Sequence, residues 1–262
     1  MDRARLVIAA IVALVAIASY FGSTSENPLT GEKQRVAMSP QQEIALGART
    51  APQMAAQMGG ISQNEKARAL VRRVGEGLVA KSLAAKSGYK FSFHLLADPR
   101  TVNAFALPGG PIFITEGLLR QLKTEAELAG VLGHEIGHVI ARHSSERLAK
   151  QQLTQGLVGA LVVGSGDYTA AQIGQVVGSM INMRYGREDE IESDILGVRI
   201  MAEGGYDPRA LIRVMEVLAK ASGGSRQPEF VSTHPAPENR SARIKEEISK
   251  RFPNGVPEGL KK

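Results

Sequence analysis

The alternation of apolar and polar positions divides the chain into segments that are mostly helical, with two short strand-like segments before its middle. Helical segments repeat apolar residues every three or four positions, whereas strands alternate. At the first helix, Ser39-Pro40 places proline at the first helical position, where its missing amide proton costs nothing. We expect an α+β fold that is mostly helical. The pattern predicts helices at about 39–58, 64–87, 188–203 and from 207 onward, and strands at about 89–98 and 107–115.

The second strand has a feature that bears on peptide binding. Pro111 stands at its start, and a residue without an amide proton is best tolerated in a strand at the edge of a sheet. We therefore expect an exposed edge strand formed by Ile112, Phe113, Ile114 and Thr115. Such a strand could hold an extended peptide by strand addition. The same pattern is also that of an ordinary sheet edge.

The N-terminal segment 1–25 has the composition of a secretory signal or a membrane anchor. A short head with Arg3 and Arg5 precedes an uncharged stretch, Leu6–Ser25. Ala16-Ile17-Ala18 could be a cleavage site, so the anchored and the cleaved form both stay open. In either form the positive head stays in the cytoplasm and the rest is exported.

The remaining segments follow from composition along the chain. A polar stretch with Pro28 and Gly31 predicts a linker at 26–38. A single domain is expected at 39–251, and a flexible tail rich in Pro and Gly at 252–262. The weakly charged segment 151–183 is expected to be a packed helical hairpin, with contact to a membrane as the alternative.

Composition limits the chemistry. The net charge of +6 comes from 32 basic and 26 acidic residues without a basic block, so a nucleic-acid partner is not expected. Cysteine is absent, which excludes disulfides and thiolate metal sites. A metal would have to be bound by His, Asp or Glu.

One helix carries polar residues that do not suit an apolar segment. It begins at a capping box, Thr124 to Glu127, and contains His134-Glu135-Ile136-Gly137-His138, which matches H-E-x-x-H. Residues four apart lie about 40° apart on a helix, so His134 and His138 can bind one metal ion. Glu135 lies beside them, where it can take a proton from a metal-bound water.

Small residues border the two histidines on this helix. They allow a second backbone to approach closely, at a cost in helix propensity of about 1 kcal/mol per glycine. Plain helix packing is the alternative reading. The residues of this small-residue stripe are Ala126, Gly130, Gly133, Gly137 and Ala141.

Two further histidines do not fit the metal site. His143 is five residues past His138 and points away from the pair, so we expect it to be solvated or hydrogen-bonded. His94 falls within the first predicted strand and is expected to be structural.

Without cysteine, a third ligand is expected to be a carboxylate. Glu190 and Asp194 lie four apart, so one can bind the metal while the other accepts a hydrogen bond from a ligating imidazole. Glu192 lies on the opposite side and should face solvent. The alternative is a helix start stabilised by its acids. The acidic cluster within Arg184–Met201 comprises Glu188, Asp189, Glu190, Glu192 and Asp194.

Four stretches in order resemble one family. They are VNAFALPGGPIFITEGLL (102–119), GHEIGHVIARHS, EIESD within 184–198, and STHPAPENR (232–240). Together they are similar to the HtpX-like and CAAX-prenyl-protease-type zinc endopeptidases, which are gluzincins. The resemblance covers roughly 41–248, with Ser193 standing where alanine is usual. The chain lacks the several spans of the prenyl proteases and looks like the exported, single-anchor branch.

The resemblance implies one zinc ion per chain, with His134, His138 and Glu190 as ligands. It implies that Glu135 is the general base acting on a zinc-bound water. It also implies an active-site helix packed on a small sheet with an exposed edge strand, as in gluzincins.

The resemblance gives three further residues supporting roles. Asp194 would orient a ligand, and Arg240 would steady the late His-Pro…Arg element. His234 would be a fourth ligand that closes the site or a hydrogen-bond donor to the oxyanion of the transition state.

The expected function is that of a zinc endopeptidase acting on extended segments of unfolded or misassembled envelope proteins. The expected location is the bacterial cell envelope, on the periplasmic side of the inner membrane, with membrane contact through the N-terminal segment. The alternative is a chaperone or assembly factor for envelope proteins whose zinc site is mostly closed.

Overall fold

The computed structural model describes residues 3–165, 185–221, 234 and 239–262, and they divide into two compact units. Unit 1 contains residues 1–39 and 142–185, and unit 2 contains residues 40–141 and 186–262. The domain expected at 39–251 stays a prediction, although residues 142–185 group with residues 1–39 in this division. A segment beginning just after the H-E-x-x-H helix belongs with the N-terminal residues, a long-range pairing that local sequence patterns do not encode. The hairpin expected at 151–183 lies partly outside the described residues.

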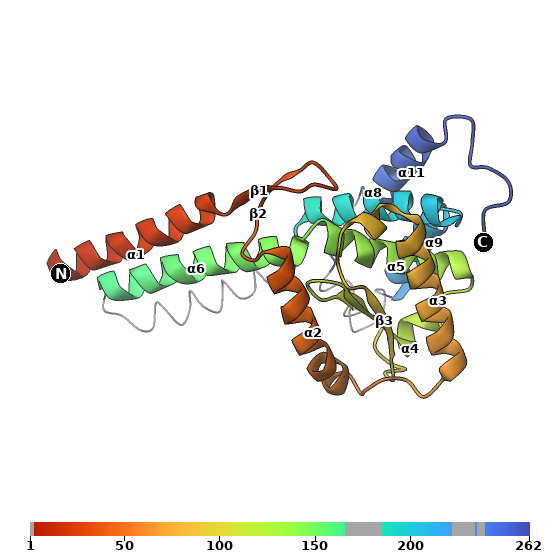
Figure 1. Cartoon of the computed structure of the whole chain (residues 1–262), viewed down its shortest axis with the longest axis horizontal. Helices are drawn as coiled ribbons and strands as arrows, with labels where there is room; N and C mark the ends of the chain where they lie inside the picture. Colours follow the sequence, from red (N-terminus) through yellow and green to blue (C-terminus); the bar gives the residue numbers. More distant parts are fainter. Residues whose placement is uncertain (1–2, 166–184, 222–233, 235–238) are drawn as a thin grey trace. The chain divides into compact units, whose positions relative to one another are not determined.

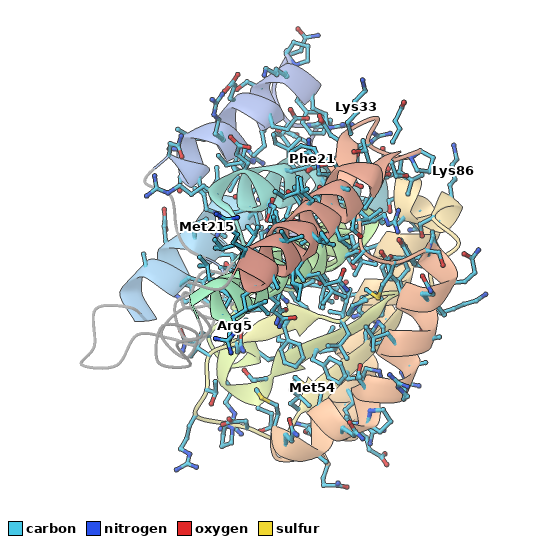
Figure 2. The ribbon with its side chains drawn as sticks, turned by 90° about the vertical axis from the view of Figure 1, so that its left-hand side faces the viewer. Arg5, Phe21, Lys33, Met54, Lys86 and Met215 are labelled. Atoms are coloured by element: carbon cyan, nitrogen blue, oxygen red, sulfur yellow. The ribbon has the colours of Figure 1, made fainter. Side chains whose placement is uncertain are left out.

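Unit 1 is built from two long helices and a small hairpin. Helix α1 (Arg3–Gly22) and helix α6 (His143–Ser165) lie side by side (Figure 1). No residue of α1 is buried, and within the described ranges α1 is the one helix long and apolar enough to cross a membrane. Figure 2 shows Arg5 and Phe21 near its two ends.

The segment expected as a linker at 26–38 is partly ordered as a hairpin. Strands β1 (Thr24–Glu26) and β2 (Lys33–Arg35) pair in antiparallel fashion. Asn27 explains the turn, because its side chain accepts a hydrogen bond from the amide of Leu29 at 2.9 Å and donates one to Gln34 at 3.0 Å.

Unit 2 contains a three-stranded sheet in the order β3-β5-β4. Strand β5 (Pro111–Thr115) pairs in parallel with β3 (Ser92–Leu96) and in antiparallel with β4 (Ala104–Ala106).

The expected edge strand Ile112, Phe113, Ile114, Thr115 is therefore wrong, because β5 is the central strand and all of its residues are buried. Pro111 is tolerated there because carbonyl oxygens, and not the missing amide proton of the proline, make the hydrogen bonds to the neighbouring strands at this point. The carbonyl of Gly110 accepts from the amide of Ser92, and that of Pro111 accepts from Leu107. The edges are β3 and the short strand β4, which the sequence pattern did not predict.

Helices surround this sheet. Helix α5 carries the H-E-x-x-H motif and packs against β4, β5, α3, α8 and α9, while α3 also packs against β3. The expected fold class, α+β and mostly helical with the active-site helix on a small sheet, is confirmed. The helices of unit 2 are α2 (Pro40–Gln57), α3 (Glu65–Lys81), the 3-10 helix η1 (Leu83–Lys86), α4 (Glu116–Leu119), α5 (Glu125–Ile140), α8 (Arg187–Gly204), α9 (Ala210–Ala221) and α11 (Arg240–Arg251).

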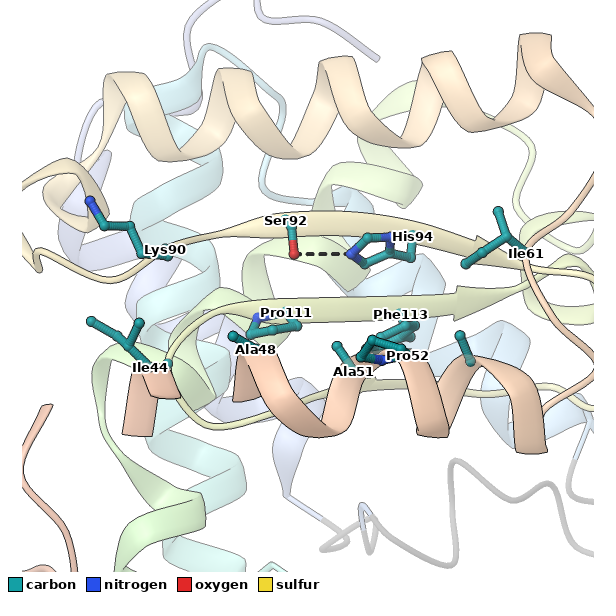
Figure 3. A pocket seen from close by; sticks show the side chains of 12 residues that line it. Ile44, Ala48, Ala51, Pro52, Ile61, Lys90, Ser92, His94, Pro111 and Phe113 are labelled. Carbon is teal, nitrogen blue, oxygen red and sulfur yellow. Dashed lines mark hydrogen bonds between the residues drawn. The ribbon is translucent and has the colours of Figure 1, made fainter. Parts of the chain in front are cut away.

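A cavity of about 410 Å³ lies between α2 and strands β3 and β5 (Figure 3). His94 lines it, hydrogen-bonds to Ser92 at 3.0 Å and stacks on Phe113 with ring centroids 4.9 Å apart. These contacts agree with the structural role expected for His94.

The segment 252–262 was expected to be a flexible tail, but its end is held by main-chain hydrogen bonds. The amide of Lys261 donates to Gly205, and its carbonyl accepts from Asp207. The Lys261 ammonium also lies 5.3 Å from the centroid of the Tyr206 ring. Proline and glycine composition alone did not reveal this pairing.

Two glycines of α3 give a matched test of this packing. A methyl group at Gly75 would overlap the ring of Phe93, whereas one at Gly77 would meet nothing within 4 Å. Gly75→Ala should lower the free energy of unfolding by about 1–3 kcal/mol through overpacking. Gly77→Ala should raise it by up to about 1 kcal/mol through helix propensity. Thermal denaturation of both variants checks the packing, and equal effects would contradict it.

Candidate metal centre

Close contact between α5 and α8 positions the site. A Cβ at Gly137 would lie 3.0 Å from the carbonyl oxygen of Ser193, and one at Gly133 would lie 3.4 Å from that of Gly197. Larger side chains would push the helices apart. The expectation that small residues admit a second backbone is confirmed for these two glycines.

The start of α5 is fixed by its cap. The Thr124 hydroxyl accepts from the amide of Glu127 at 3.2 Å, as the capping box predicts. The Glu127 carboxylate accepts from the amide of Lys123 at 2.6 Å, one residue earlier than in the standard box. The helix is thereby held at the end remote from its histidines.

Four side chains converge between the two helices. His134, His138, Glu190 and His234 each offer a ligand atom, and these atoms all lie within 4.8 Å of one another. All four residues are buried. The structure thus brings together the expected ligand set and the residue expected as a fourth ligand or oxyanion donor.

The separations fit a small tetrahedral ion. The Nε2 atoms of His134 and His138 are 3.0 Å apart, and Nδ1 of His234 lies 3.4 Å from Nε2 of His134. An oxygen of Glu190 lies 2.9 Å from Nδ1 of His234 and 3.4 Å from Nε2 of His138. Zinc bonds of about 2.0–2.1 Å in a tetrahedron place ligand atoms about 3.4 Å apart. The donors therefore suit a zinc ion in spacing and in kind.

A carboxylate and a guanidinium support the first ligand from behind. Oδ1 of Asp194 lies 2.9 Å from Nδ1 of His134, so this nitrogen carries the proton and Nε2 faces the cluster. Arg240 donates two hydrogen bonds of 2.7 Å to Asp194, and its Nη1 lies 2.9 Å from Glu190. Asp194 thus has the contact that its expected role requires, whereas Arg240, expected to steady the late His-Pro…Arg element, contacts Asp194 and Glu190 of α8.

The acids of the site remain ionised despite burial. Burial raises the pKa of Glu190, but the neighbouring imidazoles, led by His234, hold it well below its usual value. Burial also raises the pKa of Asp194, but the neighbouring Arg240 and His134 bring it below its usual value. Burial lowers the pKa of His134, yet Asp194 and Glu190 raise it to about 9. A metal ion must displace that proton in order to bind.

Charge balance points to a divalent cation. Glu135, Glu190 and Asp194 are fully buried, and in the absence of a metal the buried cations in contact with Glu190 and Asp194, among the described residues, are Arg240 and the protonated His134. Once a metal has displaced the proton of His134, Glu190 and Asp194 exceed Arg240 by one negative charge, and an ionised Glu135 would add a second. An ion of charge +2 compensates them, whereas an uncompensated buried charge is very costly.

Glu135 stands beside the cluster without forming part of it. Neither carboxylate oxygen has a hydrogen-bond partner among the described residues, and Oε1 lies 3.7 Å from Nε2 of His234. Burial raises the pKa of Glu135. This carboxylate is placed to accept a proton from a molecule entering the site.

Other candidates lie elsewhere. His143 belongs to unit 1 and is buried, with its ring 6.3 Å from that of Tyr185, so the expectation of solvation is wrong while a bonded role stands. Glu192 is half-buried and is not among the four converging residues, so the expectation that it faces solvent is only partly right. The sequence pattern missed β4, because this strand has only three residues before the turn at Leu107–Gly110 and gives a weak alternation.

The site is that of a metallopeptidase of the gluzincin class. It combines two histidines one helical turn apart with a glutamate from a second helix, and a buried glutamate stands beside the first histidine. Comparison with known proteins agrees. Residues 65–248 match peptidase family M48, and the chain belongs to this family.

Several named relatives share this region. The mitochondrial metalloendopeptidase OMA1 of Schizosaccharomyces pombe is 36% identical over 176 residues, which cover 64% of this chain and 50% of the relative. The beta-barrel assembly-enhancing protease of Escherichia coli is 30% identical over 66% of this chain and 37% of its own length. That of Yersinia pestis is 31% identical over 81% of this chain and 45% of the relative. The chain thus spans half or less of the length of these relatives.

The third ligand has a matched test on one helix. Glu190→Ala should remove an ionised donor and leave the purified protein with little zinc. Glu188→Ala, at an exposed position of the same helix, should retain the metal. Elemental analysis after dialysis measures both. Loss of zinc in Glu192→Ala and retention in Glu190→Ala would show that the ligand has been assigned to the wrong face of α8.

Proposed function

We propose that this chain is a zinc-dependent endopeptidase that hydrolyses peptide bonds of unfolded or misassembled proteins of the cell envelope. One observation carries the proposal: four buried donors converge beside a buried carboxylate that has no partner among the described residues. A purely structural zinc site would not need Glu135 next to its first ligand.

The chain's own residues account for binding and proton transfer. His134, His138 and Glu190 would hold the zinc ion, which supplies Lewis acidity and lowers the pKa of water when bound. Glu135 accepts the proton of the attacking water and passes it to the leaving amine. Its raised pKa suits it to both steps, since a weakly basic carboxylate would take the proton less readily.

Strand β4 offers the substrate an edge. Asn103 and Leu107 make main-chain hydrogen bonds to β5, so the intervening Ala104 and Ala106 direct theirs to the other side. An extended peptide would pair there, beside α5, by strand addition. Both alanines are buried, so we take this structure as a closed form.

A second function is favoured by His234. With its Nδ1 among the donors, His234 would take the coordination position that a peptidase keeps open. A mostly closed site suits a chaperone or assembly factor for envelope proteins. Two relatives are named beta-barrel assembly-enhancing proteases, which joins the two activities in one name.

The location follows from α1. Its surface is apolar and unburied, and Arg3 lies at its start. We propose that α1 attaches the protein to the inner membrane as an anchor or serves as a cleaved signal, and that the site works on the periplasmic side.

Glu135→Gln tests the general base. The variant should retain zinc, because Glu135 is not a ligand, and should lose hydrolysis of casein at least about a hundredfold. Glu188→Gln makes the same charge change at an exposed position and should leave activity unchanged. Wild-type turnover by zinc-loaded Glu135→Gln protein would refute the mechanism.

His234→Ala tests the closed site. If His234 competes for the open zinc position, its removal should raise basal proteolysis and weaken zinc binding modestly. His94→Ala, which removes an imidazole outside the cluster, is the control. A fall in turnover of about 10²–10³ with unchanged zinc affinity would instead assign an oxyanion role. No change in either quantity would leave His234 with a purely structural role.

A further inference from the structure

Helix α6 changes character in its middle. Residues 143–155 include charged and amide side chains, whereas 156–164 contain only Gly, Ala, Val and Leu. Leu157 and Leu161, four positions apart on one side of the helix, are 37% and 69% exposed. Exposed apolar surface of this kind is typical of a face that contacts a partner or a membrane.

Small residues set the register between α6 and α1. A Cβ at Gly156 would lie 2.5 Å from Cβ of Ala16, and one at Gly164 would lie 3.3 Å from Cβ of Ala9. The helices therefore run antiparallel with backbones close together, a packing typical of helices in membranes. The apolar part of α6 lies alongside the middle of α1 (Figure 1).

A membrane interface is marked at the end of α1. The guanidinium of Arg35 lies 5.2 Å from the ring centroid of Tyr20 and 4.9 Å from that of Phe21. Aromatic rings and long basic side chains gather where a bilayer meets water. In the register just given, the exposed Gln152 of α6 falls at this level. The polar part of α6 thus lies at the level of the aromatic end of α1.

The lengths agree with partial entry. Nine residues of α6, 156–164, rise about 12 Å along the helix axis. The hydrocarbon core of a bilayer is about 30 Å thick. The apolar part of α6 can therefore enter one leaflet beside α1 while its amide-bearing part stays in the headgroup region.

We infer that residues 156–164 of α6 lie inside the membrane beside α1, with Leu157 and Leu161 against lipid acyl chains. This inference rests on the proposed membrane attachment through α1. Lipid is favoured over a protein partner because α1 also exposes large apolar side chains, with Leu14 64% and Val15 62% exposed. A bilayer covers both helices with one kind of contact.

The absence of cysteine allows a direct measurement. Leu161→Cys, Leu157→Cys, Ile11→Cys and Gln152→Cys are made separately in the full chain, labelled with a nitroxide and reconstituted in vesicles of phosphatidylethanolamine and phosphatidylglycerol. Collision of each label with oxygen, which concentrates in lipid, is compared with collision with a water-soluble nickel chelate. Ile11 on α1 is the reference for lipid, and exposed Gln152 is the reference for water.

The expected result is an oxygen-to-nickel ratio at 161 and 157 that rises to the value at 11 and lies well above that at 152. A low ratio at 161 and 157 with a high ratio at 11 would overturn the inference and leave the α1 anchor intact. A low ratio at 11 as well would refute the anchor and the inference together. Weak collision with both reagents at 161 and 157 would show protein covering this face and would also overturn the inference.

Discussion

The buried charge at the centre of unit 2 is the constraint on which the rest of the site depends. Three buried carboxyl groups, of Glu135, Glu190 and Asp194, lie near one buried guanidinium, that of Arg240. Burial at this cost is tolerable only if a cation completes the balance and every other group is fixed. Arg240 contacts two acids. It pairs with Asp194, which lies behind His134, and with Glu190, which is one of the four converging donors, so it links these two carboxylates.

The packing of the helices determines the distances between the donor atoms. The donors come from three places in the chain, so the distances between them depend on how closely the elements that carry them pack. Gly133 and Gly137 set the distance between α5 and α8 through backbone contact. Side chains packed on side chains would allow more adjustment, since rotamers can change while backbones in contact cannot.

The sequence predicted the parts of the site that depend on local spacing. His134, Glu135 and His138 follow from helical periodicity, and Glu190 with Asp194 from the same rule on a second helix. The resemblance to a family supplied His234 and Arg240, which no periodicity joins to the motif.

The errors arise where long-range pairing decides. Pro111 was taken as a sign of an edge, but a proline at the first residue of a central strand removes no ladder bond that the strand needs. Strand β4 escaped detection because three residues carry too little pattern, and its partner is fixed by the turn at Leu107–Gly110. The division into two units depends on α6 packing with α1, more than a hundred residues away in the sequence.

The two proposed functions, endopeptidase and chaperone, would use the same site. They would differ in the fraction of molecules in which this site is open. In the proposed closed form, His234 would complete the zinc ligand set, and Ala104 and Ala106 of β4 are buried, so neither water nor peptide would be placed for reaction. Apparent activity then scales with the fraction of molecules that are open, and a site open about 1% of the time works about a hundredfold more slowly. A peptide that pairs with β4 binds the open form alone and shifts this population by its own binding energy. Under the proposed function, extended, unfolded segments would therefore be both the substrate and the signal that opens the site.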